Sequence, residues 1–241
     1  MKTKTQHNLK LGKRLQKNDQ MEASHYSHIW DCCCDHGLLG SSLLSRQVAN
    51  ISTNIPSKIH FVDIVPELMV DLENKLQRFY INSSWQTHCL DVASLPLEQY
   101  EGKHLVIIAG VGGDLMIKFI EEIYKKHKSL KIDFLLCPVH HQFSLRSKLI
   151  ALDFSLKDEK LVEENNRFYE VLLVSSSSDS ESKISSVGDK IWLPETQKQT
   201  EIAKRYLTKT IAHYQRMMLG VKQEHNNGIE DIIDIYQSVI L

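Results

Sequence analysis

The stretch from Ile29 to Gly40 places the tightest constraint on how this chain of 241 residues can fold. It reads IWDCCCDHGLLG, an apolar run that passes through a short polar turn into leucines at helical spacing. That order predicts a buried strand, a tight turn and a helix. In a parallel α/β sheet, the first such turn lies at the carboxyl edge, where backbone N–H groups and a helix N-terminus bind nucleotide-like ligands. Residues 31–40 are therefore a candidate ligand loop, although Gly37 and Gly40 are its only glycines.

Segments typical of strands and of helices alternate along the rest of the chain. Further strands are predicted over 59–63, 85–90, 105–109 and 132–137, and helices over 38–48, from Pro66, from about Asp114 and around Leu145. The extended runs 154–162 and 168–174, separated by residues that favour a turn, then predict a hairpin. The expected fold class is therefore α/β, with the Rossmann-like seven-stranded sheet of methyltransferases. A dehydrogenase-type domain would more often continue to alternate.

Four parts are expected in the chain. They are a basic N-terminal arm with a short helix over 1–27, the sheet domain over 28–175, a serine-rich loop over 176–193 and a C-terminal α-helical hairpin over 194–241. The serines from Ser175 to Ser186 are expected to form a surface loop without core residues. Pro194 is expected to start the first helix of the hairpin.

The composition excludes several classes of protein. Hydrophobic residues make up 42% of the chain and charged residues 24%, which is ordinary for a soluble globular protein. No apolar run approaches the roughly 20 residues that would span a bilayer, and no apolar core follows the N-terminal lysines as it would in a secretory signal. Five cysteines, three of them adjacent, form no disulfide framework and indicate a reducing compartment. We therefore expect a cytoplasmic protein.

Two segments are strongly basic although the formal net charge is only −1. The N-terminal arm carries Lys13 and Arg14, and the first helix of the hairpin carries Lys204, Arg205 and Lys209. Such segments either form a solvated surface or bind the phosphates of a nucleic acid. The sequence leaves both interpretations open.

Three aspartates follow three successive predicted strands at the ligand edge. Asp31 ends the first strand, Asp63 the second and Asp91 the third. A carboxylate after the second strand can accept both hydroxyls of a ribose, and one after the third can accept the amino group of adenine. Loop capping is the alternative for each acid taken alone. Glycines in the 109–113 loop would let a ligand approach the backbone closely, or would simply end the strand there.

Several of these motifs together resemble the bacterial tRNA (adenine 22)-N1-methyltransferase family. They are Lys13-Arg14-Leu15, the 31–40 loop, the 109–113 loop, the Pro138 loop with Leu145-Arg146, and Phe168-Tyr169-Glu170-Val171. The resemblance covers about residues 9–175 in motif order, and the predicted hairpin is similar to the family's C-terminal coiled-coil domain. The chain departs from the family at Cys32-Cys33-Cys34, where small residues and a glycine are usual. It departs again at Val139-His140-His141, where the family has an asparagine.

The resemblance implies that the chain is a divergent member of this family, an enzyme that uses S-adenosylmethionine to methylate adenine N1 of tRNA by direct displacement. The cofactor would lie on residues 28–175, held by Asp31, Cys33, Asp63, Ile64, Asp91, Val92, Ala109, Gly110 and Gly112. Asp35 and His36 would be catalytic residues, and His140 and His141 join them because their loop leaves the fifth predicted strand at the edge where the methyl group should face the base. Adenine N1 carries a free lone pair, so these residues are expected to position the base rather than act as strong bases. Lys13, Arg14, Pro138 and Arg146 would bind substrate, and the excess of positive charge on the hairpin adds Lys204, Arg205 and Lys209 to them.

The sequence also predicts the partners of the protein and leaves several other functions open. The expected partner is tRNA or another structured RNA, without membrane or metal, and the protein is expected to be a monomer or a weak dimer. A methyltransferase for another RNA, a small molecule or a protein, an inactive RNA-binding relative and a nicotinamide-dependent dehydrogenase remain open. Zinc bound by the three adjacent cysteines is not expected, because consecutive strand residues point to opposite faces and no paired C-x-x-C spacing is present.

Overall fold

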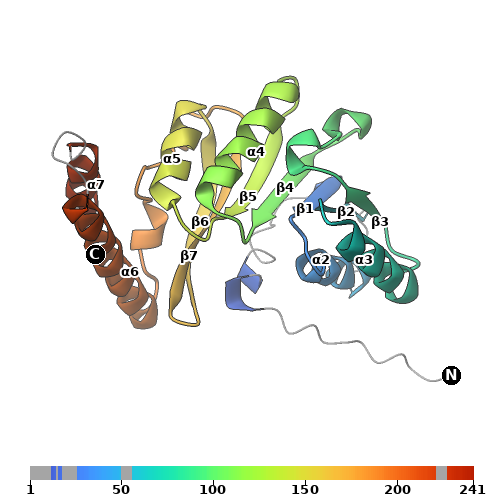
Figure 1. The fold of residues 1–241 in the computed structure, drawn as a ribbon, viewed down its shortest axis with the longest axis horizontal. Helices are drawn as coiled ribbons and strands as arrows, with labels where there is room; N and C mark the ends of the chain where they lie inside the picture. The colour runs from blue at the N-terminus through green and yellow to red at the C-terminus, as the bar shows by residue number, and fades with distance from the viewer. Residues whose placement is uncertain (1–11, 15, 18–25, 50–55, 221–226) are drawn as a thin grey trace.

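A seven-stranded sheet forms the centre of the computed structural model, which describes residues 12–14, 16–17, 26–49, 56–220 and 227–241 (Figure 1). The strands are β1 (His28–Cys32), β2 (Lys58–Asp63), β3 (Trp85–Cys89), β4 (His104–Ala109), β5 (Ile132–Cys137), β6 (Ser155–Glu164) and β7 (Arg167–Ser175). Their order in the sheet is β3-β2-β1-β4-β5-β7-β6. The first five strands are parallel, and β7 runs antiparallel to both β5 and β6. The predicted fold class and its closing hairpin are therefore confirmed.

Helices cover both faces of this sheet. They are α2 (Leu38–Ala49), α3 (Pro66–Phe79), α4 (Gly113–Lys126) and α5 (Gln142–Ala151), with short 3-10 turns η1 (Val92–Ser94) and η2 (Leu97–Gln99). Side chains alternate along β1, so that Ile29 packs with α2 and α3 while Trp30 packs in the cluster of α4 and α5. Both faces of the central strand β4 are buried, which explains why it reads as a continuous apolar run.

The C-terminal helices α6 (Gln197–Leu219) and α7 (Asn227–Gln237) pack against each other beyond β6 and β7 (Figure 1). This arrangement confirms the predicted helical hairpin. Its buried side chains share one cluster with Leu161 of β6 and Trp192 of the turn η3 (Lys190–Trp192). The first helix begins at Gln197 rather than at Pro194, because the Thr196 hydroxyl accepts the Gln199 N–H at 3.2 Å and caps it there.

The serine-rich segment differs from its expectation. Ile184 is buried in the cluster that includes α4 and α5, and Lys183 forms a β-bridge with Ser155 at the start of β6. Ser175 belongs to β7 and is itself buried. The prediction that Ser175 to Ser186 contribute nothing to the core is therefore wrong, because the one isoleucine among the serines suffices to anchor the segment.

The four-part division of the chain stays a prediction. Most of the N-terminal arm lies outside the described residues, and its described part includes helical residues at 13, 14, 16 and 17. In the described parts of the chain, no helix combines the length and the apolar character that a membrane span requires.

Candidate active site

The carboxyl ends of β1 and β2 meet around the side chain of Asp63. Cys32 pairs with Val62 in register, so the two strands end at the same level. The half-buried Asp63 carboxylate accepts the Asp35 N–H at 3.1 Å and the Val65 N–H at 3.2 Å. These hydrogen bonds therefore connect the first ligand loop, within residues 31–40, to the end of β2. Each carboxylate oxygen has a second lone pair, so the group can still accept hydrogen bonds from a ligand.

The first ligand loop turns through three residues in the left-handed region. They are Cys33 at φ 54°, Asp35 at φ 49° and Gly37 at φ 67°. At Gly37 a β-carbon would also lie 2.5 Å from Leu72 Cδ1 of α3, so only glycine fits there. The tight turn brings the loop backbone to the edge of the sheet. Asp35 and the adjacent His36 are exposed, with 3.7 Å between Asp35 Oδ1 and His36 Nε2.

The three adjacent cysteines belong to different environments. Cys32 packs in the cluster that includes α4 and α5, whereas Cys34 packs in the cluster that includes α2 and α3. Cys33 is half-buried and packs against the same cluster as Cys32, and burial together with the nearby acids, above all Asp63, raises the pKa of its thiol to about 11. The burial of Cys32 and Cys34 in these two clusters agrees with the interpretation of both as small buried apolar residues.

Cys33→Gly is expected to raise the free energy of unfolding by about 0.5 to 1 kcal/mol, because a β-carbon strains a residue in the left-handed conformation. The relief of this strain exceeds the additional chain entropy that a glycine loses on folding. Chemical denaturation at equilibrium measures the change. Cys32→Gly, in the extended and buried strand β1, is the matched control and should destabilise the protein. A Cys33→Gly variant less stable than the parent would show that the thiol contributes more than the strain costs.

The other two aspartates act on their own loops. Asp31 is buried and its carboxylate accepts the Gly40 N–H at 2.9 Å. Burial raises the pKa of Asp31 to about 7, with the Gly40 N–H opposing and nearby Asp63 adding to the shift. Asp91 is exposed and accepts the Ala93 N–H at 2.9 Å, which caps η1, while the adjacent Val92 is buried. Loop capping is thus observed for both acids, and their contact with a cofactor stays a prediction.

Two loops are joined at the ends of β4 and β5. Backbone N–H groups of Gly110, Val139 and Gly113 donate to the carbonyl oxygens of Cys137, Val111 and His140 at 3.3, 3.0 and 3.0 Å. A β-carbon at Gly112 would lie 2.3 Å from Cε1 of His140, so the imidazole ring rests directly on that glycine. The structure therefore brings the predicted residues Gly110, Gly112 and His140 together.

His140 and His141 form the exposed surface of the second of these loops. Their rings lie 4.4 Å apart in an edge-to-face arrangement. Nδ1 of His141 lies 2.7 Å from a carboxylate oxygen of Asp114, and the residue itself adopts φ 60° at the N-cap of α5. Pro138 is buried behind them, and its predicted contact with substrate stays a prediction.

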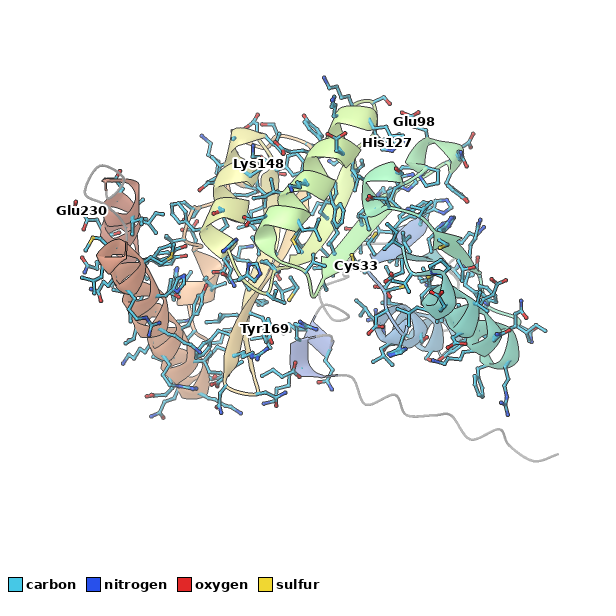
Figure 2. All side chains as sticks on the ribbon, in the orientation of Figure 1. Cys33, Glu98, His127, Lys148, Tyr169 and Glu230 are labelled. Atoms are coloured by element: carbon cyan, nitrogen blue, oxygen red, sulfur yellow. The ribbon has the colours of Figure 1, made fainter. Side chains whose placement is uncertain are left out.

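Arg14 brings the N-terminal segment to this same edge. Its guanidinium lies 5.0 Å from the centre of the ring of Tyr169, the residue labelled in Figure 2, and 3.9 Å from the position of a β-carbon at Gly110. Among the described residues, its buried Nε has no hydrogen-bond partner. The backbone N–H of Lys13 donates to the Glu164 carboxylate and anchors the segment on β6. Sequence reasoning missed Tyr169 as a site residue, although strand alternation places it on the same face as Val171.

The structure contradicts one predicted substrate-binding residue. Arg146 is fully buried on α5, where it donates to Glu170 at 2.7 Å and to Glu159 at 2.6 Å. Its third bond goes to the carbonyl of Ser185 at 3.1 Å. A guanidinium enclosed in this way cannot reach an RNA phosphate. An arginine just after an exposed loop resembles a surface cation in sequence, and only the hairpin strands reveal the two carboxylates that enclose it.

The strand order, the antiparallel seventh strand and the ligand loops at the carboxyl edge define a Rossmann-like fold of the methyltransferase type. A family model described as a methyltransferase domain matches residues 11–172. The chain belongs to this methyltransferase family. No curated protein sequence matches the chain.

Solved structures share the fold along nearly the whole chain. The B. subtilis M1A22 tRNA methyltransferase TrmK is 20% identical, with a TM-score of 0.72 over 97% of this chain and 100% of that one. Sp1610 of Streptococcus pneumoniae is 18% identical, with a TM-score of 0.75 over 96% and 100%. M. capricolum TrmK in complex with S-adenosyl-homocysteine is 16% identical, with a TM-score of 0.67 over 94% and 96%. At these identities the similarity establishes the fold, including the C-terminal helices.

Proposed function

We propose that this chain is an S-adenosylmethionine-dependent methyltransferase that acts on adenine N1 of tRNA. The observation that carries the proposal is one continuous edge, on which the loop held by Asp63 is followed by the joined loops of Gly112 and His140. Its support includes the similarity to TrmK enzymes and to Sp1610, which has been solved in complex with S-adenosyl-L-methionine. A cytoplasmic location and a monomer or weak dimer remain our predictions.

The donor and acceptor groups at this edge fit the proposed cofactor. Asp63 offers free lone pairs to ribose hydroxyls, and the exposed side chain of Ile64 beside it offers an apolar surface to a flat ring. Gly110, at φ 88°, leaves the backbone uncovered at the end of β4. When bound, the cofactor would supply an activated methyl group on its sulfonium. Cys33, Asp91, Val92 and Ala109 complete the proposed cofactor residues.

The neighbouring histidines and Arg14 would place the acceptor base. Adenine N1 carries a free lone pair, so these residues would need to align the base with the methyl group more than to remove a proton. His140 and His141 are exposed on a loop fixed by Gly112 and Asp114, and an imidazole can stack on a base or donate to its edge. Arg14, whose buried Nε has no hydrogen-bond partner in the described part of the chain, would bind a phosphate or an edge of the substrate nucleotide. Asp35 and His36 are proposed to help with this positioning.

Asp63→Ala is expected to weaken binding of S-adenosylmethionine by about 1.5 to 3 kcal/mol, the range for hydrogen bonds to a charged group. Isothermal titration calorimetry measures the affinity, and a thermal scan confirms that the variant is folded. Asp71→Ala, which removes an exposed carboxylate from α3, is the matched control and should bind as the parent does. Equal affinity of the folded Asp63→Ala variant and the parent would remove Asp63 from the site.

The basic side of α6 is proposed as the RNA surface. Arg205 donates through both terminal nitrogens to the carboxylate of Glu163 on β6. The Phe168 ring lies 5.6 Å from the Arg205 guanidinium and 5.5 Å from the Lys209 ammonium. Lys204 is exposed on the same helix. Cations held beside the β6–β7 turn in this way form a surface that suits tRNA phosphates.

Lys204→Glu combined with Lys209→Glu is expected to reduce the slope of log affinity for tRNA against log salt by about two, since each lost phosphate contact lowers it by nearly one. Filter binding over a series of salt concentrations measures the slope. The control is the same double charge reversal at Lys75 and Lys128, which are exposed elsewhere on the protein. A slope equal to that of the parent would show that α6 does not contact phosphates.

A further inference from the structure

The buried carboxylate of Glu170 joins the C-terminal hairpin to α5, the helix that follows the loop of His140 and His141, here called the histidine loop. Glu170 lies on β7 and is fully buried. One of its oxygens accepts the Tyr206 hydroxyl of α6 at 2.5 Å, and the other accepts Nε of Arg146 on α5 at 2.7 Å. The two helices are therefore held by opposite oxygens of the same group, and a movement of α6 is transmitted to α5 through a rigid connector.

An aromatic contact makes the same connection at the start of α5. Phe143, in the first turn of α5, packs in the cluster formed by the hairpin, with its ring centre 6.3 Å from that of Tyr236 on α7. Tyr236 in turn stacks on Tyr214 of α6 at 5.9 Å. Tyr236 of α7 thus contacts the first turn of α5 directly, and α6 is linked to α5 through Tyr236 and through Glu170.

The first turn of α5 is continuous with the histidine loop. His141 is its N-cap residue, and the Leu145 N–H donates to the His141 carbonyl at 3.1 Å. The preceding residue, His140, is in contact with Gly112 across the joined loops. A small rotation or shift of α5 would therefore displace both imidazole rings relative to the 110–114 loop.

We propose that Tyr206, Glu170 and Phe143 are positioning residues through which the C-terminal hairpin sets the place of His140 and His141 at the active site. This inference rests on the proposed function. It assigns the hairpin a second task besides binding RNA, because α6 carries Lys204 and Lys209 on its exposed side and Tyr206 on its buried side. The hairpin would then connect the tRNA bound on the exposed side of α6 to the position of the loop that receives the target base.

Tyr206→Phe tests the inference, because it removes one hydroxyl and keeps the ring. Its matched control is Tyr26→Phe, since the buried Tyr26 hydroxyl donates to the Asp133 carboxylate at 2.9 Å, at the opposite end of the strands. In Tyr206→Phe we expect kcat for tRNA methylation to fall by about tenfold, with the affinities for tRNA and S-adenosylmethionine unchanged. In Tyr26→Phe we expect a loss of stability and an unchanged kcat.

NMR spectroscopy gives a second measurement that does not depend on catalysis. The imidazole signals of His140 and His141 in NMR spectra should shift in Tyr206→Phe and stay in place in Tyr26→Phe. If Tyr206→Phe does not fold, Phe143→Leu replaces it, again with Tyr26→Phe as its control. Parental kcat and unshifted imidazole signals in the folded variant would overturn the inference and leave the proposed function intact. An inactive parent protein would overturn both.

Discussion

Arg146→Met is expected to lower the free energy of unfolding by about 3 to 5 kcal/mol, because it leaves uncompensated negative charge in the core. Both carboxylates that enclose this arginine, Glu159 and Glu170, are fully buried. Glu159 keeps the backbone N–H groups of Asp189 and Lys190 as donors, at 2.6 and 2.7 Å, but these neutral groups cannot replace a cation. Urea denaturation of the parent and the variant measures the difference.

Two control variants separate the buried charge from the loss of an arginine side chain. Arg78→Met on α3 removes an exposed guanidinium and should change stability by less than about 0.5 kcal/mol. Arg146→Met combined with Glu159→Gln and Glu170→Gln should recover part of the loss, since no buried charge is then left unpaired. A loss below about 1 kcal/mol in Arg146→Met alone would contradict the assignment of this network as a buried ionic connection.

Acid is expected to destabilise the protein through a row of histidines at the other end of the sheet. Nε2 of His28 lies 3.1 Å from the carbonyl of Glu101, which only accepts, so Nδ1 of the neutral His28 ring is an acceptor. Nε2 of His60 then donates to it at 3.0 Å, and Nε2 of His88 donates to Nδ1 of His60 at 2.9 Å. The three rings form one directed chain, and it requires His28 and His60 to be neutral because each accepts a hydrogen bond through Nδ1.

Trp30 and His104 extend this histidine row. Nε1 of Trp30 donates to Nδ1 of His104 at 3.2 Å, and Nε2 of His104 lies 3.0 Å from the carbonyl of Tyr100. The Trp30 ring also stacks on His60 with 3.8 Å between ring centres. Burial lowers the pKa of His60 to about 2 and that of His104 to about 4, with neighbouring histidines adding to both shifts.

The lowered pKa values of His60 and His104 determine how the stability of the protein changes with pH. Below the ordinary histidine pKa of 6.5, the unfolded chain binds protons that the folded protein does not, so stability falls as the pH is lowered. Between pH 6.5 and about pH 4.5, His60 alone accounts for about 2 to 3 kcal/mol of this loss. Asp31 acts in the opposite direction over the same range, because its raised pKa means that the folded state holds a proton that the unfolded chain loses.

His60→Gln isolates the contribution of this histidine, because glutamine offers a donor and an acceptor but does not titrate. Its free energy of unfolding should fall by about 2 to 3 kcal/mol less than that of the parent between pH 6.5 and about pH 4.5. Urea denaturation at each pH gives the two curves, and the exposed His36→Gln is the control. Parallel curves for His60→Gln and the parent would show that His60 is not held neutral.

Much of the fold could be predicted because each strand has its own local signal. The apolar run of β4 and the helix started by Pro66 need no knowledge of distant residues. The predicted positions of Asp63 and of the 109–113 loop followed from the strand ends, since parallel strands end at a common edge. The histidine row could not be predicted in the same way. Its members come from four strands, and only the register that sets Trp30 beside His60 and Val106 brings them together.

The parts of the site where distant segments of the chain meet could not be predicted from the sequence. Arg14 and Tyr169 lie in contact although most of the chain separates them. Arg146 looked like a surface cation until β6 and β7 supplied its two carboxylates. In both cases the decisive partner is on the antiparallel hairpin, whose packing against the rest of the molecule no local pattern specifies.

Mapping the methyl group that the purified protein transfers to unmodified tRNA tests the central claim most directly. The protein would be incubated with total unmodified tRNA and labelled S-adenosylmethionine, and the tRNA would then be digested to nucleosides and to fragments for sequencing. The account predicts label in 1-methyladenosine at one position of the tRNA, with transfer at limiting cofactor concentration reduced when Asp63 is replaced by alanine. Label on another base, or an active protein that leaves tRNA unlabelled and methylates a small molecule instead, would contradict it.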